Sequence, residues 1–132
     1  VVFPKRNYIP HFFTIIKQNG ALLAKGRLLG IQFDTLFMDE LYLKIGAPAI
    51  IAADRIREAL CRLGYQVCFD SPTNQIFVIM ENGRMAKVAE KAEFGIWEKY
   101  DDTHTIIRFA TSWVTDETDV ERLIDVLESN DN

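Results

Sequence analysis

Arg108 is the residue of this chain whose surroundings point most directly to chemistry. It lies in the stretch HTIIRFATSW (residues 104–113), where apolar or small uncharged residues stand on either side of it. The alternation of this stretch predicts a strand in which Arg108 faces away from Ile107 and Phe109. Because a buried charge without a partner costs several kcal/mol, the guanidinium requires an anionic partner.

Two kinds of partner would suit Arg108. A carboxylate of the chain itself, such as Asp70 or Glu98, would make Arg108 one half of a structural ion pair across the sheet. A carboxylate on a ligand would instead make it a binding residue. The residues around Arg108 leave both alternatives open.

Other residue types that commonly do chemistry are sparse. The two histidines, His11 and His104, are far apart in the sequence, which argues against a zinc site or a serine-type triad. His104 is expected to follow a turn at the edge of a strand, and a catalytic role is not expected because no nucleophile or carboxylate shares its motif. The two cysteines, Cys61 and Cys68, lack CxxC spacing and are expected to be reduced thiols in or near the core. The sequence motifs therefore predict no metal site.

Composition narrows the class of protein further. The chain has 15 lysines and arginines against 19 acidic residues, a net charge of -4, and no long basic run, which argues against a nucleic-acid partner. No apolar stretch approaches the roughly twenty residues that cross a bilayer. The start VVFPKRNYIP lacks the layout of a signal peptide. We therefore expect a cytoplasmic protein that does not bind membranes.

The hydrophobic periodicity indicates which helices and strands surround Arg108. It changes along the chain from helical to strand-like. Residues 9–37 have a helical period weakened by glycines, so they predict two helices or one broken helix. Residues 40–63 predict a second helical segment that Pro48 either kinks or divides. The remaining expected elements are strands at 65–69 and 75–80, a helix at 83–91 capped by Asn82, strands at 94–100 and 104–111, and a helix from about Thr115 or Asp116.

This order predicts an α/β (α+β) fold, with a mainly antiparallel sheet of about four strands and helices on one face. This fold is expected to span roughly residues 46–128. The N-terminal third is apolar around most of its circumference, so it needs partners on several sides.

Four segments together resemble one family. They are IKQNGALLAKGRLLGIQFDTLF (16–37), GYQVCFDSPTNQIFVIM (64–80), FGIWEKYDDTHTIIRFATSW (94–113) and the acidic-capped closing helix. In order and spacing they are similar to the PLP-dependent threonine aldolases, within the aromatic amino acid beta-eliminating lyase and threonine aldolase group of fold-type I enzymes.

The resemblance implies a division of the chain and two site residues. Residues 1–45 would be the tail of the large cofactor-binding domain, a strand end plus a long helix, and residues 46–132 the small C-terminal domain. Arg108 matches the family arginine that binds the α-carboxylate of the substrate. Arg27 matches an arginine that reaches the phosphate of pyridoxal 5'-phosphate (PLP), often in a neighbouring subunit.

The resemblance also implies an activity for the parent enzyme. It would be a lyase that cleaves L-threonine or allo-threonine to glycine and acetaldehyde by a retro-aldol step, as a homodimer or homotetramer. The lysine that forms the Schiff base with PLP would lie upstream, so this chain would hold no catalytic residue and be inactive alone. The alternatives are a related beta-eliminating amino-acid lyase, or a free-standing, non-catalytic α/β module that binds a partner protein or a small anionic metabolite.

Overall fold

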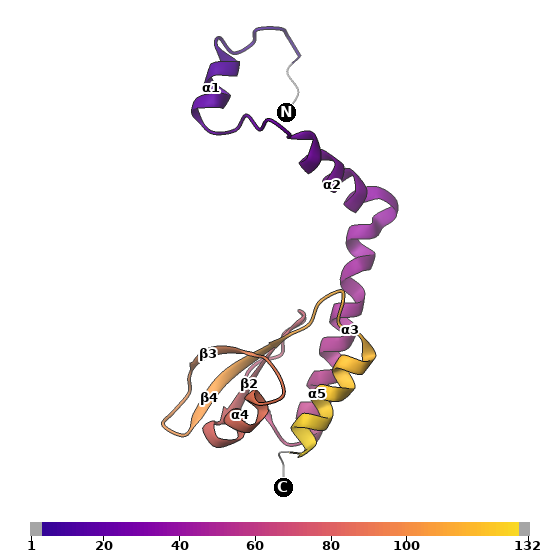
Figure 1. Cartoon of the computed structure of the whole chain (residues 1–132), viewed down its shortest axis with the longest axis vertical. Coiled ribbons are helices and arrows are strands. Elements are labelled where there is room, and N and C mark those ends of the chain that lie inside the picture. The colour runs from indigo at the N-terminus through magenta and orange to yellow at the C-terminus, as the bar shows by residue number, and fades with distance from the viewer. Residues whose placement is uncertain (1–3, 130–132) are drawn as a thin grey trace. The chain divides into compact units, whose positions relative to one another are not determined.

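The computed structural model describes residues 4–129 and divides the chain into two compact units, Val1–Tyr42 and Leu43–Asn132 (Figure 1). The sequence placed this division at residues 45 and 46. The strand end expected at the start of the chain falls largely on residues 1–3, outside the described residues. No helix in the described part of the chain is long and apolar enough to cross a membrane.

The first unit contains two separate helices, as the glycines in the sequence predicted. They are α1 (Phe12–Gln18) and α2 (Arg27–Phe37), followed by the short 3-10 helix η1 (Met38–Glu40). Neither α1 nor α2 has a buried residue. The exposed apolar side chains of this unit include Phe13, Ile31 and Phe33, each about three-fifths exposed. These two helices therefore lack an apolar core within the described part of the chain.

The long helix α3 (Leu41–Arg62) leads into the second unit. Pro48 lies inside α3, so the helix continues across it although proline cannot donate a backbone hydrogen bond. One side of α3 is buried, and the residues on it are Ala49, Ala52, Ala53, Ile56, Ala59 and Leu60. Gly64 ends the helical segment in a left-handed conformation with φ +77, which glycine adopts without steric cost.

A four-stranded antiparallel sheet forms the rest of the second unit. Its strands are β1 (Gln66–Val67), β2 (Gln75–Glu81), β3 (Gly95–Lys99) and β4 (His104–Ala110), in the order β1-β2-β4-β3. Helices α3 and α5 (Glu117–Ser129) lie side by side against one face (Figure 1). The predicted fold class is thus confirmed, although β1 is shorter than the expected strand 65–69.

The structure tests the predicted N-caps of two helices, of which one is wrong and one is confirmed. Helix α4 spans Asn82–Ala89 and its N-cap is Glu81, so the prediction that Asn82 caps it is wrong. The Asn82 side chain instead accepts a hydrogen bond of 2.8 Å from the hydroxyl of Thr105. At α5, Asp116 does cap the helix, because its Oδ1 accepts a hydrogen bond of 2.9 Å from the backbone N–H of Asp119.

The core lies between the sheet and the two long helices. Ile107 and Phe109 of β4 belong to it, together with residues of β2, α3, α4 and α5. Ile106 and Arg108 lie outside that cluster and face the opposite side of the sheet, as the alternation predicted. We call this opposite side the open face.

Candidate functional site

Arg108 is held in the middle of the sheet by pairing on both sides. In the antiparallel ladders its direct partners are Phe77 of β2 and Gly95 of β3. Side chains of directly paired residues point to the same face, so Phe77, Arg108 and the bare backbone of Gly95 form one row on the open face. The side chain of Arg108 is partly buried within this row.

The guanidinium of Arg108 has neutral neighbours. Its Nη1 donates a hydrogen bond of 3.4 Å to Oε1 of Gln75, and its Cζ lies 6.0 Å from the centre of the Trp97 ring. Within residues 4–129 Arg108 forms no ion pair, so neither Asp70 nor Glu98 is its partner. The structural ion pair considered from the sequence is therefore absent from the described part of the chain. A planar cation with this environment is suited to bind a carboxylate through two parallel hydrogen bonds.

Three aromatic side chains in contact with one another lie on the sheet beside Arg108. The rings of Phe69 and Phe77 lie 4.8 Å apart, and those of Phe77 and Trp97 lie 5.0 Å apart in an edge-to-face arrangement. Trp97 sits at a register irregularity of β3, between Ile96 and Glu98. Irregularities of this kind re-aim side chains and are common beside functional sites. The partial burial of Arg108 strengthens its attraction for an anion relative to bulk water.

The sequence reasoning missed the residues that surround Arg108. Gln75 had no distinguishing signal, because a polar residue at the start of a strand is ordinary. Trp97 carried no signal of a site either, and in the structure the residue is 54% exposed. A signal did exist for Gly95, since a glycine within a strand pattern indicates the close approach of another group.

Arg27 lies in the other compact unit. It is the first residue of α2, it follows Gly26, and it is exposed. The first turn of α2 contains no acidic residue that would neutralise it. Its charge and accessibility suit a phosphate contact, and its assignment as a cofactor-binding residue remains a prediction.

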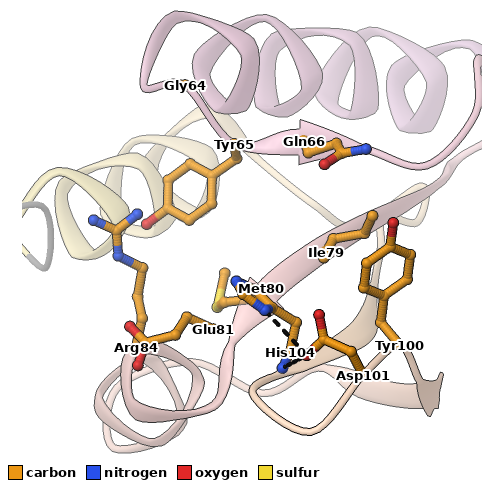
Figure 2. Close-up of a pocket in the computed structure, with 10 residues that line it drawn as sticks. All are labelled: Gly64, Tyr65, Gln66, Ile79, Met80, Glu81, Arg84, Tyr100, Asp101 and His104. Carbon is orange, nitrogen blue, oxygen red and sulfur yellow. Dashed lines mark hydrogen bonds and ion pairs between the residues drawn. The ribbon is translucent and has the colours of Figure 1, made fainter.

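A separate pocket of about 270 Å³ opens where β2, α4 and the β3–β4 turn meet (Figure 2). Asp101 and His104 line it, with His104 Nδ1 at 3.2 Å from Asp101 Oδ1. The expectation that no carboxylate accompanies His104 is therefore wrong, although His104 does begin β4 after a turn.

The Asp101 carboxylate serves the turn itself. The backbone N–H groups of Thr103 and His104 each donate a hydrogen bond of 2.7 Å to Asp101 Oδ1. Together with the Thr103 hydroxyl and the His104 ring, these hydrogen bonds, led by that of the Thr103 backbone, lower the pKa of Asp101 to about 2. The arrangement is that of a hydrogen-bonded turn that holds β3 and β4 together.

The described residues offer no cluster for a metal. Across residues 4–129, no group of three or more His, Cys, Asp or Glu side chains is arranged to hold a metal ion. Cys61 and Cys68 are free thiols, as expected. Cys61 is exposed, so its expected place in or near the core is wrong. Burial, and secondarily the charge of Glu98, raises the pKa of the Cys68 thiol.

Comparisons with known proteins indicate the class of protein to which this fold belongs. No protein-family model and no curated protein gives a significant match to the chain. Among solved structures, Leishmania major threonine aldolase superimposes with a TM-score of 0.84 and 35% identity, over 94% of this chain and 36% of that one. Sphingomonas wittichii serine palmitoyltransferase shares the fold, with a TM-score of 0.54 and 14% identity over 64% of this chain and 23% of that one.

The fold and the first match define a segment of a PLP-dependent enzyme of fold type I. Within that class, the chain is a threonine aldolase-like segment. It spans about 36% of the length of the Leishmania threonine aldolase. The resemblance stated from the sequence is thus confirmed.

The residues of this segment fit part of a PLP site. A PLP phosphate needs a cationic or hydrogen-bonding contact, and the exposed guanidinium of Arg27 has the chemistry for it. Lys5, Lys17 and Lys25 are exposed lysines of the first unit and do not match the motif of the PLP-binding lysine. Arg27 therefore has the chemistry for a phosphate contact and Arg108 that for a carboxylate contact, and both assignments remain predictions.

Proposed function

We propose that this chain is part of a PLP-dependent lyase that cleaves L-threonine or allo-threonine to glycine and acetaldehyde. The observation that carries the proposal is Arg108, a partly buried guanidinium on the open face that pairs with no carboxylate of the described chain. The 35% identity to Leishmania threonine aldolase supports the choice of enzyme class.

Arg108 would bind the α-carboxylate of the amino acid. A bidentate contact fixes the position of the carboxylate and also the plane in which it lies. Fixing that plane limits rotation of the amino acid about its Cα, so one particular bond at Cα is presented for cleavage. The contribution of Arg108 is therefore orientation, and it applies to every α-amino acid that enters the site.

PLP, when bound, supplies an electron-accepting ring that stabilises negative charge at Cα. On this proposal Arg27 holds the cofactor phosphate. The covalent attachment of PLP depends on a lysine outside this segment. A protein made of this segment alone is expected to have no lyase activity.

The many exposed apolar side chains of α1 and α2 support a homodimer or homotetramer for the enzyme, because such side chains are commonly covered in an assembly. The free thiols of Cys61 and Cys68 support a cytoplasmic location.

The test uses the full-length, PLP-loaded enzyme that carries this segment. Arg108→Ala should raise the KM for threonine by about ten- to a hundredfold, the value of a hydrogen-bonded charge contact. The PLP content should stay unchanged. Arg122→Ala removes an exposed arginine of α5 and is the matched control, expected to have little effect. An unchanged KM in Arg108→Ala would reject the assignment.

Product analysis decides the reaction. Glycine and acetaldehyde from threonine support the aldolase. Ammonia and a keto acid would show a related beta-eliminating lyase instead, since Arg108 recognises only the carboxylate that all these substrates share.

A further inference from the structure

The absence of a side chain at Gly95 leaves space beside one edge of the Arg108 guanidinium. A Cβ placed on Gly95 would lie 3.4 Å from both Nε and Nη2 of Arg108, and 3.7 Å from Cζ. The nearest atoms are thus the two nitrogens of a single edge. Nη1, on the other side of the guanidinium, donates its hydrogen bond to Gln75.

The Nε–Nη2 edge has the geometry that binds a carboxylate. Its two N–H groups point in the same direction and match the two oxygens of a carboxylate. With Nη1 donating to Gln75 and the Trp97 ring near the guanidinium, this edge is the part of Arg108 that remains to receive a ligand. The approach to it passes the position that a side chain of residue 95 would fill.

A glycine is an unfavourable choice for this position on other grounds. Glycine has low strand propensity, and a β-branched residue would pack better in β3, which is one of the two edge strands of the sheet. Its backbone is not in the positive-φ region that would demand glycine. The local requirements of the strand therefore do not explain Gly95.

We propose that Gly95 is a positioning residue for Arg108, which keeps the Nε–Nη2 edge open so that the α-carboxylate of the amino acid docks against it. This inference rests on the proposed function, because it takes Arg108 as the carboxylate-binding residue. Gly95 itself touches no reacting atom. Its role is to leave the space in which the carboxylate and the guanidinium meet.

The size of the side chain at position 95 gives a graded test. An alanine Cβ at 3.4 Å from the two nitrogens would be in ordinary van der Waals contact, so Gly95→Ala is the matched control. Valine adds two methyl groups beyond that Cβ, in the space in front of the edge. Because valine favours strands, Gly95→Val should keep β3 intact.

The experiment measures kcat and KM for threonine in the full-length, PLP-loaded enzyme. Gly95→Val should raise KM by about tenfold or more, as expected for loss of one charge-assisted hydrogen bond, with little change in kcat or PLP content. Gly95→Ala should stay close to the parent. Added to Arg108→Ala, Gly95→Val should raise KM no further, because the edge it blocks is already gone.

The outcomes separate this inference from the proposed function. If Arg108→Ala leaves KM unchanged, the proposed function fails, and this inference with it. If Arg108→Ala raises KM while Gly95→Val behaves like Gly95→Ala, this inference alone is overturned. It is also overturned if Gly95→Val raises KM equally in the Arg108→Ala background, since the effect would then be structural.

Folding is followed by circular dichroism and thermal unfolding. If Gly95→Val fails to fold alone and folds in combination with Arg108→Ala, crowding against the guanidinium is the cause, and Gly95→Ser, which carries one Oγ in place of the two methyl groups, replaces it in the KM comparison with the same outcomes. Failure of both proteins to fold would show that β3 rejects the side chain for its own reasons, and would overturn it.

Discussion

The hydroxyl of Thr111 donates a hydrogen bond of 2.6 Å to the backbone carbonyl of Ala49, and so joins the end of β4 to α3. Thr111 is buried, with 4% of its surface exposed. Its backbone N–H also donates a hydrogen bond of 3.0 Å to the carbonyl of Asn74. The strand that carries Arg108 is therefore tied, three residues later, to the helix layer and to the start of β2.

Replacing Thr111 by valine should destabilise the protein by about 1 kcal/mol, and by up to about 3 kcal/mol if the buried carbonyl of Ala49 is left poorly satisfied. Valine has nearly the same shape, so the loss isolates the hydroxyl. Thr111→Ser retains the hydroxyl and should keep most of the free energy of unfolding that Thr111→Val loses. Urea unfolding of the three proteins measures the difference, and equal midpoints for Thr111→Val and the parent would contradict it.

Arg57 should prove more important than an exposed helix arginine. It lies on α3 and pairs with Asp54 three residues before it, as an exposed helix arginine commonly does. However, its Nη2 also donates a hydrogen bond of 2.7 Å to the carbonyl of Ser71, and its side chain is only 17% exposed. Arg57→Ala should lower the free energy of unfolding by about 1.5–3 kcal/mol through loss of hydrogen bonds from a charged donor.

Arg62→Ala is the matched control for Arg57. Arg62 also lies on α3 and pairs with Glu128 at 2.6 Å, but its side chain is 62% exposed. Exposed ion pairs contribute about 0–1 kcal/mol, so this change should be small. Equal losses in the two variants, measured by urea unfolding, would show that the contact between Arg57 and the loop at Ser71 adds nothing.

The sequence predicted well those features that depend on local pattern. The two faces of β4, the α3 stripe and the turn before His104 all follow from periodicity or turn chemistry. The Asn82 cap failed because a competing interaction over a long sequence separation engages its side chain, the hydrogen bond from Thr105. Local capping preference cannot register such a partner.

The candidate site was predictable only in its central residue. Arg108 was conspicuous because it was the charge within an apolar strand. Its neighbours Gln75, Gly95 and Trp97 come from strands that are distant in sequence, and their proximity depends on the register of the β2–β4 and β3–β4 pairs. That register emerges from the whole sheet, so the space beside the guanidinium could not be read from any one segment.

Asp101 should titrate at unusually low pH. Its pKa is lowered to about 2, from an ordinary 3.8, by the hydrogen bonds that its carboxylate accepts, chiefly from the Thr103 backbone. A lowered pKa in the folded state means that ionised Asp101 stabilises the β3–β4 turn above about pH 4. That contribution is lost as the pH falls from about 4 through 2.

Carboxyl NMR measures this titration directly, and the backbone amide shifts of Thr103 and His104 should follow the same curve. Asp101→Asn keeps an oxygen acceptor without an ionisable group, so these amides should show no such step. A carboxyl pKa of 3.8 in the parent would mean that the hydrogen bonds to Asp101 do not persist in solution.

Arg27 and Arg108 should divide cofactor binding from substrate binding when each is changed in the full-length enzyme. If Arg27 holds the PLP phosphate, Arg27→Ala removes a charge-assisted contact and should raise the Kd of PLP by about ten- to a hundredfold. At saturating PLP, the KM of the Arg27→Ala enzyme for threonine should match that of the parent. Arg108→Ala should show the reverse pattern.

Titration of the apoenzyme with PLP, followed by kinetics at saturating PLP, measures both constants. Lys25→Ala is the control for loss of a nearby exposed charge. A PLP affinity in Arg27→Ala equal to that in Lys25→Ala would make Arg27 an ordinary solvated helix arginine and leave the role of Arg108 untouched.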